Sequence, residues 1–348
     1  MSPLILSLLL LSLGLGTTIT FASSHWLLAW MGLEINTLAI LPLMARTPHP
    51  RAVEATTKYF ITQATAAAVI LFASTTNAWI TGEWSITHTM APVTTVLITM
   101  ALALKLGLAP THFWLPEVLQ GLDLTTGLIL STWQKLAPFI LLLQLTAPSP
   151  TLLTGLALTS ILVGGWGGLN QVQVRKILAY SSIAHLGWMT LISQFSAPLA
   201  LLALFTYILM TTSAFLTIKL NAATTINSLA TAWTKSPALT AFVPLVLLSL
   251  GGLPPLTGFA PKWMILQELT KQQLPLIATA AALMALLSLY FYLRLSYAMA
   301  LTVAPSTPPA STPWRFSHAQ PTLLLSVTTI ATLALLPLTP TALTLLDL

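Results

Sequence analysis

A small set of ionisable residues lies within long apolar stretches of this sequence. The set comprises Glu34, Lys105, His112, Lys135, His185 and Lys262. A buried lysine holds its proton while a carboxylate is close and releases it more readily once the carboxylate moves away. Histidine exchanges protons near neutral pH without such help. Residues of these types in a row, with water between them, could therefore relay protons.

The composition requires that these side chains lie in a membrane. Only 6% of the 348 residues are charged and 56% are apolar, with a mean hydropathy of +0.87. A soluble domain carries about 25% charged residues, and a disordered chain would need higher charge and lower hydrophobicity. The net charge of +6 does not indicate nucleic-acid binding, because in a membrane protein the position of basic residues matters more than their sum.

An isolated charge in the middle of a membrane is costly, so each of these side chains is a functional hypothesis by default. The alternative is a set of fixed ion pairs that hold helices together, or, for the histidines, a neutral ring satisfied by one hydrogen bond. Glu117 could similarly bind backbone donors near a helix break. Glu54 and Lys58 have i,i+4 spacing, which predicts an interfacial ion pair without chemistry.

Apolar runs bounded by proline, glycine or charge predict an all-α polytopic membrane protein with about 11 transmembrane helices. The expected spans cover residues 3–21, 24–44, 57–80, 92–121, 125–147, 150–170, 176–195, 197–220, 237–271, 274–301 and 322–345. Only two connections are long, one from Arg46 to Thr56 and the other from Val303 to Gln320.

The expected spans 92–121 and 237–271 are each interrupted by the pattern Gly-Leu-x-Pro. The pattern occupies Gly107, Leu108 and Pro110 in the first, and Gly252, Leu253 and Pro255 in the second. Proline inside a helix removes a backbone hydrogen bond and clashes with the preceding turn. We therefore predict broken helices near 107–110 and 251–255, with a simple proline kink as the alternative. The freed carbonyls must face protein or a wet cavity.

The two interruptions lie in the fourth and ninth spans, five helices apart. A repeat with an odd number of spans is inserted upside down relative to its neighbour, as in transporters that bind ions at discontinuous helices. We expect a first five-helix repeat over residues 1–147, a second, inverted repeat over residues 150–301, and a C-terminal transmembrane helix over residues 322–348.

The basic residues are distributed unequally between the two sides of the membrane. Eight fall on the side of the N-terminus: Arg46, Arg51, Lys58, Arg175, Lys176, Lys219, Lys235 and Arg315. Lys271 alone falls on the other side, and Arg294 can snorkel toward the first. The positive-inside rule predicts that the N-terminus is on the cytoplasmic or matrix side and, after eleven spans, that the C-terminus is outside.

Several kinds of cofactor site find no support in the residues. The chain has no cysteine, which excludes Cys-ligated zinc and iron–sulfur sites. Its seven acidic residues are too few for a divalent-metal cage. The glycine run from Gly164 to Gly168 follows no strand, so it predicts close helix packing rather than a nucleotide-binding loop. We expect no metal and no cofactor in this chain.

Four ordered motifs resemble the antiporter-like subunits of respiratory complex I, NADH:ubiquinone oxidoreductase, and among them the subunit 2 family in its vertebrate mitochondrial form. The motifs run from Trp26 to Asn36, from Ala101 to Glu117, from Gly164 to His185 and from Gly251 to Trp263, and the similarity extends from about Ser24 to Arg294. The resemblance implies a proton-translocating membrane-arm subunit of the mitochondrial inner membrane, with its N-terminus in the matrix and its C-terminus in the intermembrane space.

The same resemblance implies roles for single residues and for partners. Glu34 and Lys105 would be the coupling pair, Lys135 the central relay lysine and Lys262 the lysine of the second broken helix, with His112 and His185 on the same axis. The sites for NADH, FMN, iron–sulfur clusters and ubiquinone would lie on other subunits. The partners would be other membrane-arm subunits, in a hetero-oligomer, and membrane lipid.

The second repeat departs from the family pattern. His185 lies on the seventh span, where the first repeat has Glu34 on its second, and spans six to ten have no carboxylate at mid-membrane. A complete second Glu–Lys unit is therefore in doubt. Two other functions stay open: a cation/proton antiporter component with the same fold, and a structural scaffold whose buried charges only hold helices together.

Overall fold

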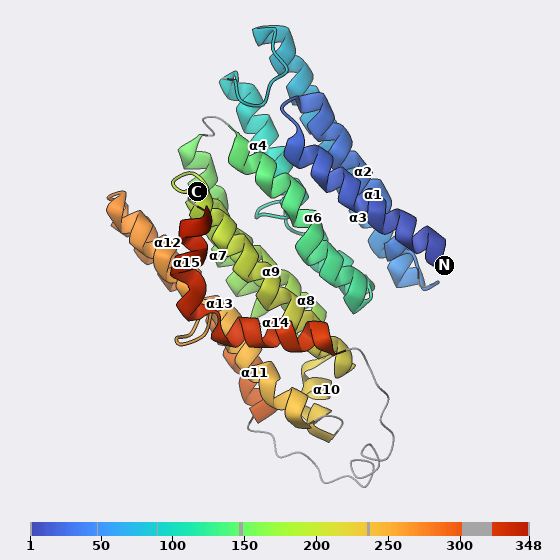
Figure 1. Ribbon diagram of the computed structural model, residues 1–348, viewed down its shortest axis with the longest axis vertical. Coiled ribbons are helices and arrows are strands. Elements are labelled where there is room, and N and C mark those ends of the chain that lie inside the picture. The colour runs from blue at the N-terminus through green and yellow to red at the C-terminus, as the bar shows by residue number, and fades with distance from the viewer. Residues whose placement is uncertain are drawn as a thin grey trace. The chain divides into compact units, whose positions relative to one another are not determined.

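A computed structural model describes residues 2–46, 48–88, 90–145, 149–234, 237–300 and 322–346 (Figure 1). Over these residues the secondary structure is helical, with two isolated β-bridges. Seven of the described helices are long and apolar enough to cross a membrane, and the bent C-terminal pair adds an eighth span if it counts as one. The chain is thus an all-helical, multi-pass membrane protein. The predicted connection from Val303 to Gln320, with Arg315, and Lys235 lie outside the described residues.

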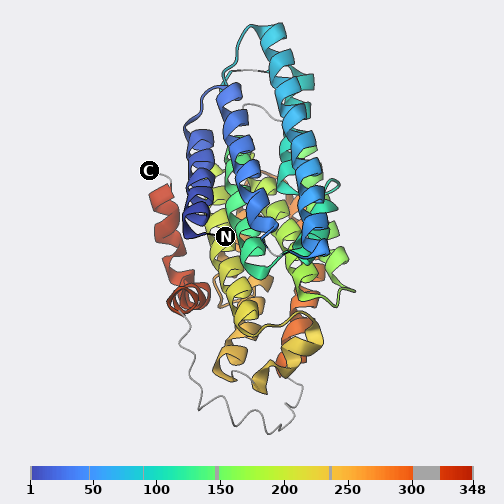
Figure 2. The same ribbon diagram turned by 90° about the vertical axis from the view of Figure 1, so that its right-hand side faces the viewer.

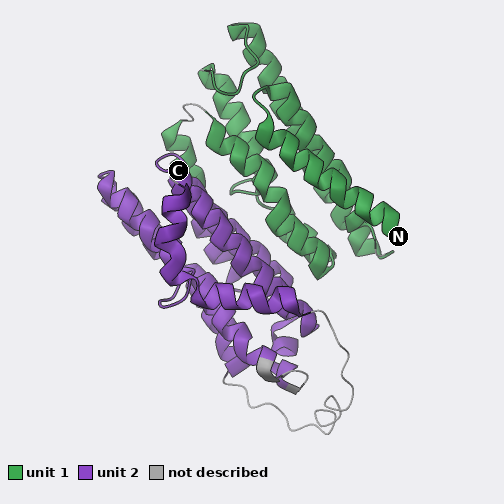
Figure 3. Ribbon diagram, in the orientation of Figure 1, with its two compact units in different colours: residues 1–160 green, residues 161–348 purple. Residues whose placement is uncertain are grey.

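The helices form two compact units, residues 1–160 and 161–348 (Figure 3). The first contains α1 (Pro3–Ala22), α2 (Trp26–Met44), α3 (Pro50–Thr81), α4 (Pro92–Leu106), α5 (Trp114–Gly121), α6 (Leu124–Gln144) and most of α7 (Pro150–Gly168). Within this unit α2 packs against α1, α3 and α6, and α4 packs against α3 and α6. These contacts place α2, α3, α4 and α6 around a shared interior.

Small residues allow α1 and α2 to pack closely. A Cβ atom at Gly16 would lie 2.6 Å from Asn36 Oδ1, and one at Gly32 would lie 2.6 Å from the methyl carbon of Thr20. Helices in lipid gain little from the hydrophobic effect between them, so close van der Waals packing at small residues is what holds them together. The contact also fixes the face of α2 that carries Asn36.

The second unit contains the end of α7 and the helices that follow it. These are α8 (Val174–Ile192), α9 (Ala197–Leu220), α10 (Ile226–Ala230), the 3₁₀ turn η1 (Thr231–Thr234), α11 (Pro237–Gly251), α12 (Phe259–Lys271), α13 (Pro275–Ala300), α14 (Leu323–Ala334), η4 (Leu336–Leu338) and α15 (Thr339–Leu346) (Figure 2). Here α9 packs against α8, α11, α12 and α14, and α13 packs against α8, α11 and α12.

The glycine run at the end of α7 packs closely against its neighbours, as its sequence predicted. A Cβ atom at Gly164 would lie 2.6 Å from the backbone nitrogen of Ala184 on α8. At Gly165 it would lie 2.8 Å from Cβ of Leu287 on α13. No larger residue fits at either position unless α7 moves away from both helices.

One β-bridge secures the start of a helix in each unit. In the first, Trp26 N donates to Trp84 O and Ile86 N donates to Ser24 O, at 3.0 and 2.9 Å. In the second, Val174 N donates to Thr224 O and Ile226 N donates to Val172 O, at 3.1 and 3.2 Å. The bridges tie the start of α2 to the segment after α3, and the start of α8 to the segment after α9.

The helix interruptions occur where Gly-Leu-x-Pro predicts them. α4 ends at Leu106 before α5 begins at Trp114, and α11 ends at Gly251 before α12 begins at Phe259. Gly107 and Gly252 follow the two helix ends with φ of +81° and +79°. This left-handed conformation costs other residues about 1–2 kcal/mol. The helices are therefore broken at these points, not merely kinked.

Hydrogen bonds between side chains and backbone tie each break to a neighbouring helix. In the first, Ala109 N donates to Ser160 Oγ at 2.9 Å, and Thr159 Oγ1 donates to Ala109 O at 3.3 Å. At the second, Ser249 and Thr257 both donate to the carbonyl oxygen of Thr332 on α14, at 3.1 and 2.5 Å. Polar contacts of this kind are what irregular backbone requires at membrane depth.

Two details differ from the sequence-based expectation. The predicted connection from Arg46 to Thr56 is largely helical, because α3 begins at Pro50, where proline occupies the first turn and the His49 side chain accepts from Arg51 N. The predicted C-terminal span is not one continuous helix. α14 and the segment Leu336–Leu346 meet at an angle of 72°, and Pro337 lies in the short 3₁₀ turn between them.

Candidate functional site

The first unit brings a partly buried glutamate and a buried lysine close together. Glu34 lies halfway along α2 and Lys105 lies in the last turn of α4. Glu34 is close enough to interact electrostatically with Lys105 and with Tyr59. Among the described residues, neither Glu34 Oε2 nor Lys105 Nζ has a hydrogen-bond partner, and both atoms are buried. The pair is therefore close but not locked by a direct bond.

Lys105 lines a small cavity with other polar side chains. The cavity measures about 10 Å³, and its polar lining consists of Asn36, Thr37, Tyr59, Gln63, Lys105 and Gln134. The amide atoms of Asn36 and Gln63 Nε2 are buried without a hydrogen-bond partner in the described part of the chain. A volume of this size with several polar partners suits about one water molecule. The lining can therefore bind water beside Lys105.

Asn36, Gln63 and Gln134 are residues that sequence reasoning did not select. Gln134 donates from Nε2 to the carbonyl oxygen of Asn36 at 3.2 Å, which ties α6 to α2. Each of the three is an uncharged amide inside an apolar helix. Lys105 was selected because it is a polar group at membrane depth. The same criterion applies to these three amides, but it is weaker for them because they carry no charge.

Lys135 and His112 are buried in the same unit but do not line this cavity. Lys135 lies on α6 with 3% of its surface exposed. His112 lies in the break between α4 and α5, where a ring nitrogen bonds the backbone of Pro110 and the ring packs 4.4 Å from that of Phe113. His112 therefore hydrogen-bonds the irregular backbone between α4 and α5.

The side chain of Lys262 links the two helices that flank the second break. It lies in the first turn of α12, and its Nζ donates to the carbonyl oxygen of Gly251 at 2.7 Å. A Cβ atom at Gly252 would lie 2.9 Å from this Nζ. Because the C-terminal end of a helix is negative, the amine binds at the favourable end of α11. Unlike Lys105, Lys262 has a backbone partner.

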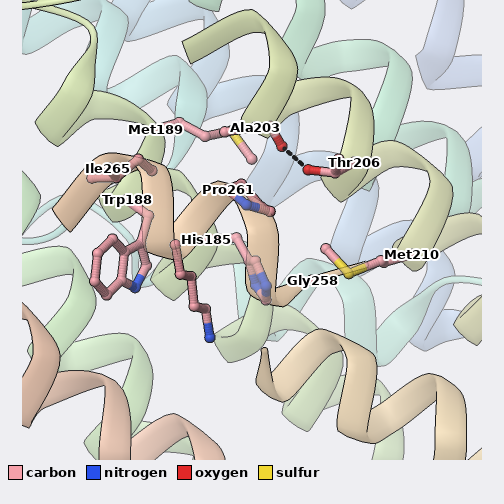
Figure 4. Close-up of a pocket in the computed structure, with 10 residues that line it drawn as sticks. His185, Trp188, Met189, Ala203, Thr206, Met210, Gly258, Pro261 and Ile265 are labelled. Atoms are coloured by element: carbon pink, nitrogen blue, oxygen red, sulfur yellow. Dashed lines mark hydrogen bonds between the residues drawn. The ribbon is translucent and has the colours of Figure 1, made fainter. Parts of the chain in front are cut away.

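His185 shares a cavity of about 20 Å³ with Lys262 (Figure 4). His185 Nδ1 lies 2.7 Å from the carbonyl oxygen of Ser181. A carbonyl oxygen only accepts, so Nδ1 carries a proton, and in the neutral ring Nε2 is the basic atom. The rest of the cavity wall is mainly apolar and includes Trp188, Met189 and Met210.

A buried tyrosine, Tyr207, lies beside His185. The rings of His185 and Tyr207 lie 5.5 Å apart, and the Tyr207 hydroxyl hydrogen-bonds Ser182. Tyr207 and Tyr292 have no exposed surface. Sequence reasoning missed both, because an aromatic residue in an apolar helix usually indicates core packing.

A charged cluster outside these cavities joins α3 to α5. Lys58 Nζ lies 2.8 Å from Glu54 and 2.7 Å from Glu117. The predicted Glu54–Lys58 pair is confirmed. Glu117 forms an ion pair with Lys58, which differs from the backbone interaction considered for it. All three side chains are exposed, and exposed pairs contribute at most about 1 kcal/mol each.

The arrangement suits proton exchange better than catalysis on an organic substrate. Both cavities are of water size and contain acid–base side chains. In the described part of the chain, no three His, Asp or Glu side chains gather as metal ligands. Lysine and histidine beside a water molecule can hold, release and pass on a proton, and Glu34 lies close enough to Lys105 to influence it.

Comparison with known proteins shows which family the chain is similar to. A family model described as NADH:quinone oxidoreductase/Mrp antiporter, transmembrane region, matches residues 23–288, and one described as NADH dehydrogenase subunit 2 C-terminus matches residues 289–343. The chain is 69% identical to NADH-ubiquinone oxidoreductase chain 2 from Carassius auratus, over 99% of both chains. It is also 69% identical to the same chain from Salmo salar, over 100% of both.

Two solved structures have the same fold. A chain of respiratory complex I from Thermus thermophilus is 30% identical with a TM-score of 0.85, over 98% of this chain and 79% of that one. A chain of the Mrp complex from Dietzia sp. is 17% identical with a TM-score of 0.81, over 97% of this chain and 77% of that one. At this lower identity the second likeness shows the fold alone.

Proposed function

Because the chain belongs to the NADH:quinone oxidoreductase/Mrp antiporter family, as a member of its NADH-ubiquinone oxidoreductase chain 2 group, we propose that it moves protons through the buried side chains described above. The family predicted from four sequence motifs is confirmed. The chain is an antiporter-like membrane subunit of NADH:ubiquinone oxidoreductase, complex I. The proposal concerns how it couples electron transfer to proton movement.

The unpaired Lys105 is the single observation that best supports this proposal. A buried amine without a hydrogen-bond partner is unfavourable for stability, which argues against a purely structural role. Glu34 nearby and a water-sized cavity give that amine a proton donor, a proton acceptor and a route between them. We propose that Glu34 controls whether Lys105 holds its proton, and that Lys135 and His112 continue the relay.

The second unit would carry protons in a different way. Lys262 and His185 line one cavity, and the proton on His185 Nδ1 leaves Nε2 as the exchanging atom. A rotation of Lys262 away from the Gly251 carbonyl would free its amine to exchange with that cavity. In place of a carboxylate, His185 has the buried Tyr207 as its neighbour, with the two ring centroids 5.5 Å apart.

The repeat arrangement is part of the proposal. Both units contain a helix broken after a left-handed glycine and a β-bridge at the start of a helix, which supports two five-helix repeats. If α4 with α5, α11 with α12, and α14 with α15 each form one span, they join α1, α2, α3, α6, α7, α8, α9 and α13 to give 11 spans. We propose inversion of the second repeat from the odd number of spans.

The proposed location is the mitochondrial inner membrane, with the N-terminus in the matrix. The vertebrate relatives and the asymmetric basic residues support it. Arg294 on α13 donates to the carbonyl oxygen of Leu169, which follows α7, at 2.6 Å. The proposed topology requires the ends of α7 and α13 to lie on the same side, and this bond is consistent with that.

Membership of complex I suggests where the cofactors bind and which proteins this chain contacts. We propose that NADH, FMN, the iron–sulfur clusters and ubiquinone bind to other subunits, and that this chain contacts neighbouring membrane-arm subunits in a hetero-oligomer. A distant redox step would then act on Glu34 and Lys105 through charge coupling and movement of the helices.

Proton uptake by sealed vesicles separates this function from the sodium–proton antiporter alternative. The assembled complex should acidify or alkalinise the vesicle lumen only while NADH is oxidised, with a rate independent of sodium. Proton movement that stays fast without NADH and requires sodium would contradict the proposal. Copurification of the chain with a flavin-containing assembly in mild detergent would be the matching biochemical result.

A further inference from the structure

A groove on the second unit lies apart from both relay cavities. It has a volume of about 740 Å³ and is lined by Leu169, Asn170, Leu286, Leu287, Tyr290 and Arg294. We refer to these six residues as the α13 groove, since four of them belong to α13. Its volume falls within the range of about 300–1,000 Å³ that is usual for ligand pockets. The groove is thus large enough for part of an organic ligand.

The lining changes character along α13. Leu286, Tyr290 and Arg294 are spaced four residues apart, so they lie on one face of the helix over two turns, about 12 Å. Leu286 and Tyr290 are 57% and 60% exposed. The wall passes from apolar, through an aromatic ring with a hydroxyl, to a guanidinium. This order matches the order of acyl chain, glycerol backbone and phosphate in a phospholipid.

Arg294 is positioned to bind an anion in the groove. Its half-buried side chain is oriented by the hydrogen bond from Nη1 to the carbonyl oxygen of Leu169, at 2.6 Å. A guanidinium has five N–H donors, and this bond uses one of them. Arginine binds phosphate through paired hydrogen bonds more readily than any other side chain.

The surroundings place the groove at a membrane surface. Trp166, three residues before Leu169, is 68% exposed, and exposed tryptophan is typical of the interface between lipid and water. The basic residues Arg175 and Lys176 follow closely in the sequence and raise the local positive charge. Basic pockets between helices at this level attract anionic headgroups.

We propose that the α13 groove binds an anionic phospholipid. Its phosphate would accept hydrogen bonds from Arg294, Asn170 and the Tyr290 hydroxyl, while an acyl chain would follow Leu286 and Leu287. Free phosphate would make no use of the apolar wall, which is why we assign the site to a lipid. The bound lipid would hold the end of α7 against α13.

Photoreactive lipids test the site in the assembled complex. Complex reconstituted in vesicles receives phosphatidylglycerol or phosphatidylcholine with a diazirine on one acyl chain, and mass spectrometry locates the label on peptides of α13. Phosphatidylglycerol should label the segment 286–290 about fivefold more than phosphatidylcholine, because both lipids have a phosphate but the trimethylammonium group of phosphatidylcholine cancels the net negative charge that Arg294 attracts. Arg294→Gln should abolish this preference, and Lys219→Gln, at the end of α9, should retain it.

A second variant covers the case in which Arg294→Gln fails to assemble. Leu286→Trp fills the apolar part of the groove, leaves the bond between Arg294 and Leu169 intact, and should also lower the labelling by phosphatidylglycerol. Equal labelling by the two lipids, or labelling unaffected by both variants, would overturn the proposal. Displacement of the label by millimolar inorganic phosphate would also overturn it, since it would indicate a site for the free anion.

Discussion

The two lysines beside the breaks differ in one hydrogen bond. Lys105 Nζ has no partner in the described part of the chain, whereas Lys262 Nζ donates to the carbonyl oxygen of Gly251. A buried polar group without a partner is destabilising, and a charge-assisted hydrogen bond is stabilising. The fold therefore depends on Lys262 more than on Lys105, although both are assigned to the same relay.

Substitution by methionine should separate the two roles. Lys262→Met removes the bond to Gly251 O and should destabilise the chain by about 1–3 kcal/mol. Lys105→Met combined with Glu34→Gln removes both members of a charged pair that has no direct hydrogen bond, and should leave stability unchanged or raised. Thermal denaturation of the assembled complex, followed by loss of this chain on native gels, measures the difference. Equal losses in the two variants would contradict the assigned hydrogen bonding.

The second break depends on contact between a glycine and a lysine as well as on backbone conformation. Gly252 has a φ of +79°, and a Cβ atom there would lie 2.8 Å from Lys262 Cδ. Gly82, the C-cap of α3, has a similar φ of +76° with nothing within 4 Å of its Cβ position. The two glycines share the conformational requirement and differ in the contact.

Gly252→Ala should therefore impair the enzyme more than Gly82→Ala. Both variants lose about 1–2 kcal/mol from the left-handed conformation, but only Gly252→Ala displaces Lys262 from the Gly251 carbonyl. Turnover of NADH in assembled complex, at matched expression, is the measurement. If the two variants have equal turnover, the contact with Lys262 has no role in coupling.

Local sequence signals predict the elements better than they predict the site. The Gly-Leu-x-Pro pattern acts within a few residues, so both breaks follow from the sequence, as does the close packing of the glycine run in α7. The cluster of Asn36, Gln63 and Lys105 comes from α2, α3 and α4. Such a cluster depends on how the helices rotate and pack, and no local pattern encodes that. The ion pair between Lys58 and Glu117 escaped prediction for the same reason.

At the scale of the whole molecule, the proposed topology is testable because the chain contains no cysteine. Single substitutions Arg51→Cys, Lys219→Cys and Lys271→Cys each introduce one thiol into this chain. In sealed vesicles, an impermeant maleimide should label position 271 from one side and positions 51 and 219 from the other, as read on peptides of this chain. Labelling of all three from the same side would contradict the assigned orientation.

The rate of proton pumping by complex that carries Lys105→Met tests the central claim most directly. No hydrogen bond among the described residues is lost with Lys105, and a measurement on fully assembled complex separates a change in pumping from a change in assembly. Positioned acid–base groups contribute about 100-fold or more to proton transfer. We predict that pumping driven by NADH falls by about tenfold or more in fully assembled complex, while the exposed Lys219→Met control is unaffected. Unchanged pumping by Lys105→Met would contradict the relay.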